Sequence, residues 1–360
     1  MTKNKLKIGI VGCGVIADIH AQAIMESQNT ELVSAFSRNE KNASTFGEKY
    51  KIKWESDWEQ FISNPDIDAV SICTPSGNHL DYGEKAAKAG KHVVVEKPIE
   101  VTLERAKQLI NICKEEGVQL AVIFQSRFML QIQDLKQKLD DNIIGKLFMG
   151  DAYIKWFRSQ EYYDSGGWRG TLKLDGGGVL INQSIHTIDL LQWIMGGVES
   201  IYGQIGTFTH ERLEGEDNAV ATLRFKSGAV GVIEGSTSVQ PSQSRRLELH
   251  GENGSATIDN NSVDIQLANS EDNKENNNED IQVGMGSSSP LAGFSIHPHK
   301  DQFDAIAKAI EKNEIPPVSG EESLKALAIV LAIYESSKTN KPIILDDFIK
   351  SKIHEKFTMN

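Results

Sequence analysis

Short apolar runs alternate with helical patterns over the first third of the chain. The runs contain mostly β-branched or small apolar residues, which is typical of strands buried on both faces of a parallel sheet. They occupy residues 6–11, 31–36, 69–73, 93–95 and 121–124. The pattern therefore predicts βαβ units at the start of the chain.

The pattern changes in the second half, where short alternating runs are separated by turn residues, as expected for antiparallel strands. Such runs lie at residues 151–157, 219–225, 229–234 and 246–251. Helical patterns lie at residues 179–195, 301–311 and 321–337. Because 360 residues exceed the size at which one core usually keeps growing, we expect two domains, at 1–125 and 126–360. The last long helix should pack back on the first domain.

A glycine-rich turn follows the first predicted strand. Residues 12–17 read G-C-G-V-I-A, and a helical pattern begins near Ile16. In this G-x-G-x-x-A pattern the glycines let the backbone approach a pyrophosphate, and the helix N-terminus favours the anion. Glycine-rich turns also occur without ligands, but the strand before and the helix after this one favour dinucleotide binding. The expected contacts are Gly12, Gly14, Val15 and Ile16.

The end of the second predicted strand bears on the choice of cofactor. Ser37 and Arg38 stand where an acidic residue would bind a free ribose 2′-hydroxyl. A charge-assisted hydrogen bond to a 2′-phosphate is worth about 1.5 to 3 kcal/mol, roughly a tenfold to hundredfold preference. The pair therefore favours NADP. Alternatively, Arg38 stacks on the adenine and tolerates NAD as well.

Two later strands, at 69–73 and 93–95, also run into polar turns. The residues of interest in these turns are Thr74, Pro75, His79, Glu96 and Lys97. Ligands of open α/β sheets lie at the carboxyl ends of the strands, so we expect these side chains near the cofactor. Lys97 also fits a solvent-exposed charge at a strand end, and His79 also fits a helix cap.

Aromatic and basic side chains cluster before the apolar helix predicted at 179–195. They are Trp156, Arg158, Tyr162, Tyr163, Trp168 and Arg169. Aromatic faces pack on sugar or nicotinamide rings, and arginine binds phosphate or carboxylate in a bidentate manner. A packed core is the alternative, although the glycines at 166, 167 and 170 indicate a loop. Arg127 either holds an anionic substrate group or pairs with a carboxylate, and the sequence leaves both open.

The helix predicted at 179–195 carries a polar stripe. Asn182, His186, Asp189 and Trp193 recur at steps of four, three and four, which places them on one face of an α-helix. Because the rest of the helix is apolar, we expect this polar stripe to face a polar environment. A buried structural histidine is the usual explanation for a single residue of this kind.

These turns, in this order, resemble those of the Gfo/Idh/MocA oxidoreductase family, and the resemblance covers almost the whole chain. It implies an α/β Rossmann domain followed by an α+β domain with a large, mostly antiparallel open sheet. It also implies hydride transfer between a nicotinamide and a sugar or polyol carbon. Lys97 and His186 would then be the catalytic residues on either side of the reacting hydroxyl.

The segment 159–168 and the N-Q-x-x-H pattern are similar to the subgroup that contains the UDP-N-acetylglucosaminuronate 3-dehydrogenases. This subgroup favours NAD, in conflict with Ser37 and Arg38. Asn182 stands where many family members carry aspartate, so we expect it to orient substrate and not to relay protons. The cofactor contacts expected here are Trp168 and Arg169. The expected substrate contacts are Lys97, Arg127, Tyr163, Asn182, Gln183 and His186.

Other readings of the site remain. A dehydrogenase of a free sugar or polyol would need no nucleotide in its substrate, and a dinucleotide-sensing protein would bind the cofactor without turnover. Related proteins pair the open face of the sheet with a second subunit, so the resemblance implies a homodimer or homotetramer.

Composition and charge argue against several classes of protein. A net charge of -12 argues against a nucleic-acid partner. The absence of a long apolar run or a secretion signal predicts a cytoplasmic protein without a membrane span. Three scattered cysteines are too few for a disulfide framework or a zinc site, and we expect no metal. An acidic surface loop is expected at 269–280, and His297 and His299 fit capping or solvation better than a site.

Overall fold

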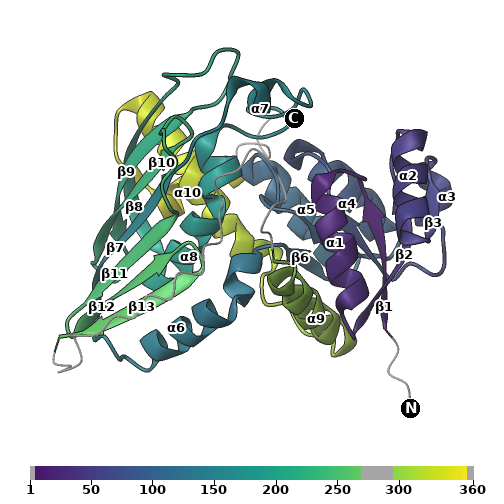
Figure 1. The fold of residues 1–360 in the computed structure, drawn as a ribbon, viewed down its shortest axis with the longest axis horizontal. Coiled ribbons are helices and arrows are strands. Elements are labelled where there is room, and N and C mark those ends of the chain that lie inside the picture. Colours follow the sequence, from purple (N-terminus) through teal and green to yellow (C-terminus); the bar gives the residue numbers. More distant parts are fainter. Residues whose placement is uncertain (1–4, 269–294, 355–360) are drawn as a thin grey trace. The chain divides into compact units, whose positions relative to one another are not determined.

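The computed structural model describes residues 5–268 and 295–354, which form two compact units (Figure 1). The first unit consists of Met1–Phe128 and Ser295–Leu327, and the second of Met129–Phe294 and Ala328–Asn360. The acidic segment 269–280 lies outside the described residues.

The first unit is built on a six-stranded parallel sheet with the strand order β3-β2-β1-β4-β5-β6. The strands are β1 (Leu6–Val11), β2 (Thr30–Phe36), β3 (Lys53–Glu55), β4 (Ala69–Ile72), β5 (His92–Val95) and β6 (Leu120–Val122). The order reverses direction between β1 and β4, and ligands of such sheets bind at the carboxyl ends of the strands beside this point. The predicted Rossmann domain is confirmed.

Helices connect these strands. They are α1 (Val15–Glu26), α2 (Glu40–Tyr50), α3 (Trp58–Ile62), η1 (Ser76–Asn78), α4 (His79–Lys88), α5 (Leu103–Glu115), η2 (Gln125–Phe128) and α9 (His297–Glu311). We expected α9 in the second domain, whereas it groups with the first unit. Its Gln302 bonds the backbone of Val122 and Phe124, and its Phe303 is buried in the core that α1 shares. Periodicity predicts a helix but does not show which core it joins.

The second unit is built on an eight-stranded sheet with the order β13-β12-β11-β7-β10-β9-β8-β14. The strands are β7 (Leu147–Lys155), β8 (Val198–Gly206), β9 (Asn218–Phe225), β10 (Val230–Ser236), β11 (Arg246–Gly251), β12 (Gly254–Asp259), β13 (Ser262–Leu267) and β14 (Ile343–Ile344). Only β10 and β7 run parallel; the other neighbours in this sheet are antiparallel. The predicted large, mostly antiparallel sheet is confirmed.

The two faces of this sheet differ in burial. Ala152, Leu223 and Ile233 are buried on one face, and α8 packs against β7. The opposite face exposes Val220 and Val230. The remaining helices are α6 (Leu130–Asp140), α7 (Gln160–Asp164), η3 (Val179–Ser184), α8 (Ile185–Met195), α10 (Gly320–Thr339) and α11 (Leu345–His354).

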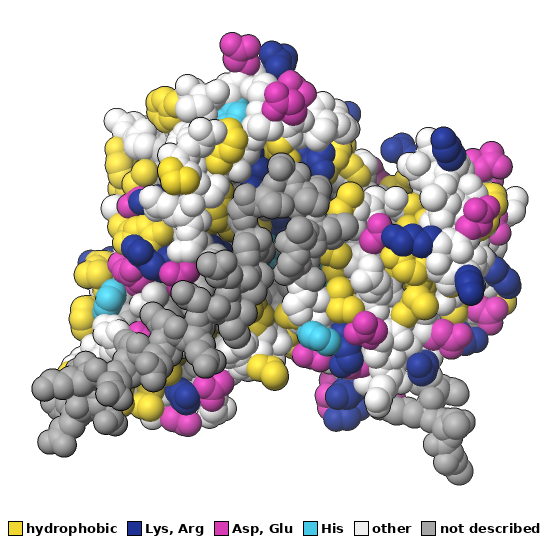
Figure 2. Space-filling model, in the orientation of Figure 1, with side chains coloured by type: hydrophobic (Ala, Val, Ile, Leu, Met, Phe, Trp, Pro, Cys, Tyr) yellow, Lys and Arg dark blue, Asp and Glu magenta, His cyan; other side chains and the backbone are white. Residues whose placement is uncertain are grey.

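The last long helix, α10, divides between the units, because its residues up to Leu327 group with the first. Just before it, the Val318 carbonyl accepts a hydrogen bond from the Val122 N–H beside β6. In Figure 2, basic and acidic side chains are interspersed on the face shown. Among the described residues, the helices fall short of the length and apolarity that a bilayer crossing needs.

Candidate cofactor and substrate sites

The turn after β1 leaves room for a ligand close to the backbone. Gly12 has a φ of +95°, and a side chain there would come within 3.0 Å of the Cys73 carbonyl oxygen. Gly14 caps α1 without a side-chain hydrogen bond, and a Cβ on it would meet nothing within 4 Å. Val15 is exposed and Ile16 is partly exposed. The start of α1 can therefore receive an anion such as a pyrophosphate.

The end of β2 presents a cation and a hydroxyl. The Ser37 N–H donates to the Glu55 carbonyl at 3.2 Å, and its hydroxyl accepts from the Asn39 N–H at 3.3 Å. Arg38 is exposed. Burial raises the pKa of Tyr82, and the positive charge of Arg38 partly offsets this rise. This arrangement fits either a 2′-phosphate or an adenine ring beside Arg38.

The turn after β4 contains two polar side chains with different roles. The Thr74 hydroxyl is available to a ligand, and His79 bonds to the main chain. The Thr74 hydroxyl is buried and has no hydrogen-bond partner among the described residues. His79 is fully buried, with Nε2 at 3.1 Å from the Thr74 carbonyl and Nδ1 at 2.9 Å from the Pro98 carbonyl. Burial lowers the pKa of His79. We expected His79 to contact the cofactor, whereas the structure uses it to connect the two turns, because both ring nitrogens face main-chain carbonyls. Pro75 is partly exposed beside Thr74.

The turn after β5 is fixed by a buried carboxylate. Glu96 Oε1 lies 2.7 Å from His20 Nε2, and Oε2 accepts from the Lys97 N–H at 3.1 Å. Burial alone would raise the pKa of Glu96, but the hydrogen bond and charge of His20 lower it to about 2. Because β1, β4 and β5 are adjacent and parallel, Lys97 begins at the same end of the sheet as Gly12 and Thr74.

In the second unit, arginine and aromatic side chains alternate in a stack that we call the arginine ladder. Its members are Trp156, Arg158, Tyr162, Arg169 and Trp168. Each guanidinium carbon lies 4.9 to 5.4 Å from the centroids of its two neighbouring rings. All five residues are partly exposed, so the ladder is a cationic, aromatic surface.

The ladder is tied to the helix that carries His186. Arg158 donates to the Gln183 side-chain oxygen at 2.8 Å, and the Gln183 amide donates to the Tyr162 hydroxyl at 2.8 Å. The Asn182 amide donates to Asp175 at 2.6 Å. The structure therefore brings together Arg158, Tyr162, Asn182 and Gln183, four of the residues that the sequence analysis selected.

The predicted helix at 179–195 is not a uniform α-helix. Residues Val179–Ser184 form a π-helical segment, and α8 begins at Ile185. Single π turns occur frequently at functional sites. Asp189 is fully buried, whereas Asn182 and His186 are partly exposed. His186, Asp189 and Trp193 keep the predicted spacing within α8, but Asn182 lies in the π-helical segment, where the 3.6-residue spacing does not hold.

Two residues expected to bind substrate are engaged inside their own units. Both terminal guanidinium nitrogens of the buried Arg127 contact Glu322, at 3.1 and 3.2 Å. The structure thus shows the carboxylate pairing that the sequence left open. Tyr163 is 7% exposed, and its hydroxyl lies 2.9 Å from the Thr237 hydroxyl. Its burial leaves little surface for a substrate.

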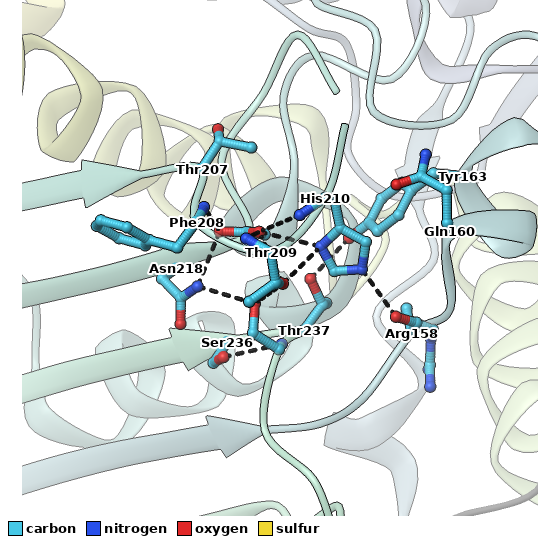
Figure 3. A network of polar contacts seen from close by, with 12 residues as sticks. Arg158, Gln160, Tyr163, Thr207, Phe208, Thr209, His210, Asn218, Ser236 and Thr237 are labelled. Carbon is cyan, nitrogen blue, oxygen red and sulfur yellow. Dashed lines mark hydrogen bonds and ion pairs between the residues drawn. The ribbon is translucent and has the colours of Figure 1, made fainter. Parts of the chain in front are cut away.

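A buried histidine–aspartate pair beside the ladder was missed by the sequence analysis (Figure 3). Asp217 accepts hydrogen bonds from the backbone N–H groups of residues 208–210, and its Oδ2 lies 3.0 Å from His210 Nδ1. His210 Nε2 lies 2.8 Å from the Arg158 carbonyl oxygen. The pair thus holds the main chain of Arg158. The only sequence signal was a histidine near several acidic residues, a common surface pattern.

Two groups of side chains bring three potential metal ligands within 4.8 Å of one another. They are His20, Glu96 and His299, and Asp151, Glu248 and His250. In the first group a 2.7 Å hydrogen bond already joins the His20 and Glu96 atoms. In the second, Arg246 neutralises Glu248 at 2.6 Å. In both groups, potential ligand atoms therefore already have hydrogen-bond or ion-pair partners in the protein.

The comparisons with known proteins agree with this architecture. The family model described as "Oxidoreductase family, NAD-binding Rossmann fold" matches residues 6–124, and "GFO/IDH/MocA C-terminal domain" matches residues 132–257. The chain belongs to the Gfo/Idh/MocA oxidoreductase family. It is thus an oxidoreductase with a Rossmann domain of an NAD-binding family, as the sequence predicted, and the choice between NAD and NADP stays a prediction.

Relatives within this family act on different compounds. The chain is 27% identical to myo-inositol 2-dehydrogenase of Thermotoga maritima, with 96% of this chain and 100% of the relative covered. It is 30% identical to scyllo-inositol 2-dehydrogenase (NAD(+)) of Bacillus subtilis, over 71% and 74% of the two chains. Among solved structures, the WlbA dehydrogenase from Bordetella pertussis in complex with NADH and UDP-GlcNAcA is 30% identical, with a TM-score of 0.83 over 95% and 99%.

Proposed function

We propose that the protein oxidises a secondary alcohol of a sugar or sugar derivative with NAD or NADP, and reduces the ketone in the opposite direction. The observation that carries this proposal is the cofactor turn. Gly12, the open start of α1 and the Thr74 hydroxyl lie at the carboxyl ends of neighbouring parallel strands, in a chain of this oxidoreductase family.

Lys97 and His186 are the proposed catalytic residues. His186 accepts the proton of the substrate hydroxyl as a general base, and the charge of Lys97 stabilises the developing alkoxide. A nicotinamide held at the turns of Gly12 and Thr74 would supply the hydride acceptor for the same carbon. In the reverse direction His186 returns this proton to the alkoxide oxygen, which the charge of Lys97 stabilises until it is protonated. Asn182 and Gln183, bonded to Asp175 and Arg158, orient the sugar.

Replacement of Lys97 by methionine tests this assignment. We expect Lys97→Met to lower kcat at least about a hundredfold, because charge stabilisation of the alkoxide is lost. The dissociation constant for NADH, measured by fluorescence, should change less than about threefold. His186→Asn should behave in the same way, because general-base catalysis is lost.

The matched control is Lys88→Met, which removes an exposed lysine paired with Glu84 on α4. It should leave kcat unchanged. Unchanged turnover in Lys97→Met would remove lysine from the mechanism. Cofactor binding by the wild type without turnover of any alcohol would instead favour a dinucleotide-sensing protein.

The arginine ladder favours a nucleotide sugar over a free sugar as substrate. Two guanidinium groups among three aromatic rings fit a diphosphate and a base, since arginine pairs with phosphate and rings stack on bases. A free sugar or polyol, as in the inositol dehydrogenases named above, is the second candidate. A panel of UDP-sugars and free sugars, assayed with NAD and NADP separately, distinguishes them. Arg169, which the resemblance places at the cofactor, is here proposed to bind the substrate diphosphate, so Arg169→Ala should raise KM for a UDP-sugar about tenfold or more and leave KM for a free sugar unchanged. An equal rise in KM for the cofactor would return Arg169 to the cofactor.

We also propose that two copies of the chain pair through the exposed face of the eight-stranded sheet. Val220 and Val230 lie on this face with Met149, and they are 56%, 47% and 36% exposed. Apolar side chains gathered on one sheet face are typical of a subunit interface.

A further inference from the structure

Four polar side chains from four elements meet in the interior of the first unit. They are His20 of α1, Ser71 of β4, Glu96 after β5 and His299 of α9, with 0%, 0%, 7% and 1% exposure. Burying polar groups costs stability unless they are hydrogen-bonded. A cluster of this kind therefore needs a reason beyond packing.

The bonds of the cluster lead to Lys97. His20 Nδ1 lies 2.8 Å from the Ser71 hydroxyl, and Nε2 lies 2.7 Å from Glu96 Oε1. The second oxygen of Glu96 accepts the Lys97 N–H at 3.1 Å. Both carboxylate oxygens are thus engaged, one by the imidazole and one by the backbone of the proposed catalytic lysine.

The surroundings of His20 favour its protonated form. Burial alone would lower the pKa of His20, but Cys73, whose sulfur lies 3.3 Å from Nδ1, and Glu96 raise it to about 10. Burial and the charge of His20 lower the pKa of His299 to about 3. Lys97 adds positive charge beside Glu96. These shifts favour an imidazolium at His20, a carboxylate at Glu96 and a neutral imidazole at His299.

We propose that His20 and Glu96 form a positioning pair for Lys97. The imidazolium of His20, on α1, holds the Glu96 carboxylate in place. The carboxylate in turn accepts the hydrogen bond from the Lys97 N–H, and this bond orients the backbone of Lys97 after β5. The effect on turnover rests on the proposed function. The state of the pair itself can be measured without turnover.

The first measurement uses ¹⁵N-histidine NMR of the full chain, with His20→Gln to assign the signal. In the wild type both ring nitrogens of His20 should remain protonated up to about pH 8. In Glu96→Gln the pKa of the ring should fall, because the carboxylate no longer opposes the effect of burial. A neutral His20 at pH 7 in the wild type would overturn the pair, whatever the enzyme's activity.

The second measurement is turnover against pH. His20→Gln should lower kcat about tenfold to a hundredfold, with NADH binding within about threefold of the wild type. Without its cation the buried Glu96 should protonate nearer neutral pH, which adds an acidic limb to the profile. The double variant His20→Gln/Glu96→Gln should lack this limb and be no slower than Glu96→Gln alone, because paired residues give non-additive losses.

His92→Gln is the control, because His92 accepts a hydrogen bond from the Gln119 N–H at the other end of the same strand. It should lose stability but keep its kcat. Additive losses in the double variant, or an equal loss of kcat in the control, would mean that the pair is only structural. A wild type that turns over no alcohol would contradict the proposed function and leave the NMR result standing.

Discussion

At the scale of single residues, Arg38 bears most directly on the choice of cofactor. It is exposed directly after β2, and Ser37 and Arg38 stand where an acidic residue would bind a free ribose 2′-hydroxyl. We expect Arg38→Ala to raise KM for NADP about tenfold to a hundredfold, the value of one charge-assisted bond to phosphate. KM for NAD should change less than about threefold. Initial rates with both cofactors measure this.

Lys41→Ala on α2 is the matched control, because it removes a nearby exposed cation. It should leave the ratio of the two KM values unchanged. If Arg38→Ala weakens NAD and NADP equally, Arg38 stacks on the adenine and does not read the 2′-phosphate.

Residues whose role depends on the backbone were predicted best. Gly12 needs its positive φ and its close approach to Cys73, and a glycine pattern records that need in the sequence. Residues whose role depends on a distant partner were not. Nothing beside Arg127 in the sequence indicates Glu322, and nothing beside His20 indicates Glu96, because these pairs form only when separate elements pack.

At the scale of elements, Glu216 holds the start of the helix that carries His186. The carboxylate is 2% exposed and accepts hydrogen bonds from the N–H groups of Gly178 and Leu180 and from the Tyr334 hydroxyl. Burial raises its pKa to about 7 despite these donors. The helix start therefore contains a carboxyl group that titrates near neutral pH.

We predict that this group makes stability depend on pH. Glutamate in an unfolded chain has a pKa of about 4.3. Because the folded state holds the proton more tightly, the contribution of Glu216 is fully present below about pH 4 and is lost as pH rises through about 7. Relative to Glu216→Gln, the wild type should lose roughly 2 to 3 kcal/mol between pH 4.5 and 8. Denaturant unfolding at several pH values measures the difference.

Glu211→Gln is the control, since Glu211 is exposed and close in sequence. Its stability should follow the wild type at every pH. A constant difference between the wild type and Glu216→Gln would show that Glu216 does not titrate in this range.

Apolar periodicity predicted most of the elements but not their irregularities. It placed a helix over 179–195 and could not show the π segment Val179–Ser184, because one extra residue per turn leaves the apolar pattern almost unchanged. The π-helical segment reflects tertiary packing. A Cβ on Gly178 would lie 1.8 Å from the Glu216 carbonyl oxygen, so this turn has to fit against a distant strand connection.

At the scale of the whole molecule, the sequence predicted both sheets. A strand that is buried on both faces reads as a continuous apolar run, whereas a strand with one exposed face alternates between apolar and polar residues. Every position of β4 in the first unit is buried, whereas β9 alternates between buried and exposed positions. The same alternation leaves one face of the eight-stranded sheet exposed, and solvent exposure of Val220 and Val230 there is unfavourable for an isolated chain.

The double variant Val220→Lys/Val230→Lys tests whether a second copy covers this face. The two positions lie on neighbouring antiparallel strands, so two added cations per copy would repel across a symmetric interface. We expect the wild type to elute as a dimer or tetramer in light-scattering chromatography and the variant to shift towards monomer. Ile315→Lys is the control, because Ile315 is 76% exposed between α9 and α10 and belongs to the first unit. A wild-type monomer, or a variant with unchanged mass, would mean that this face does not join subunits, since buried lysines without partners cost several kcal/mol.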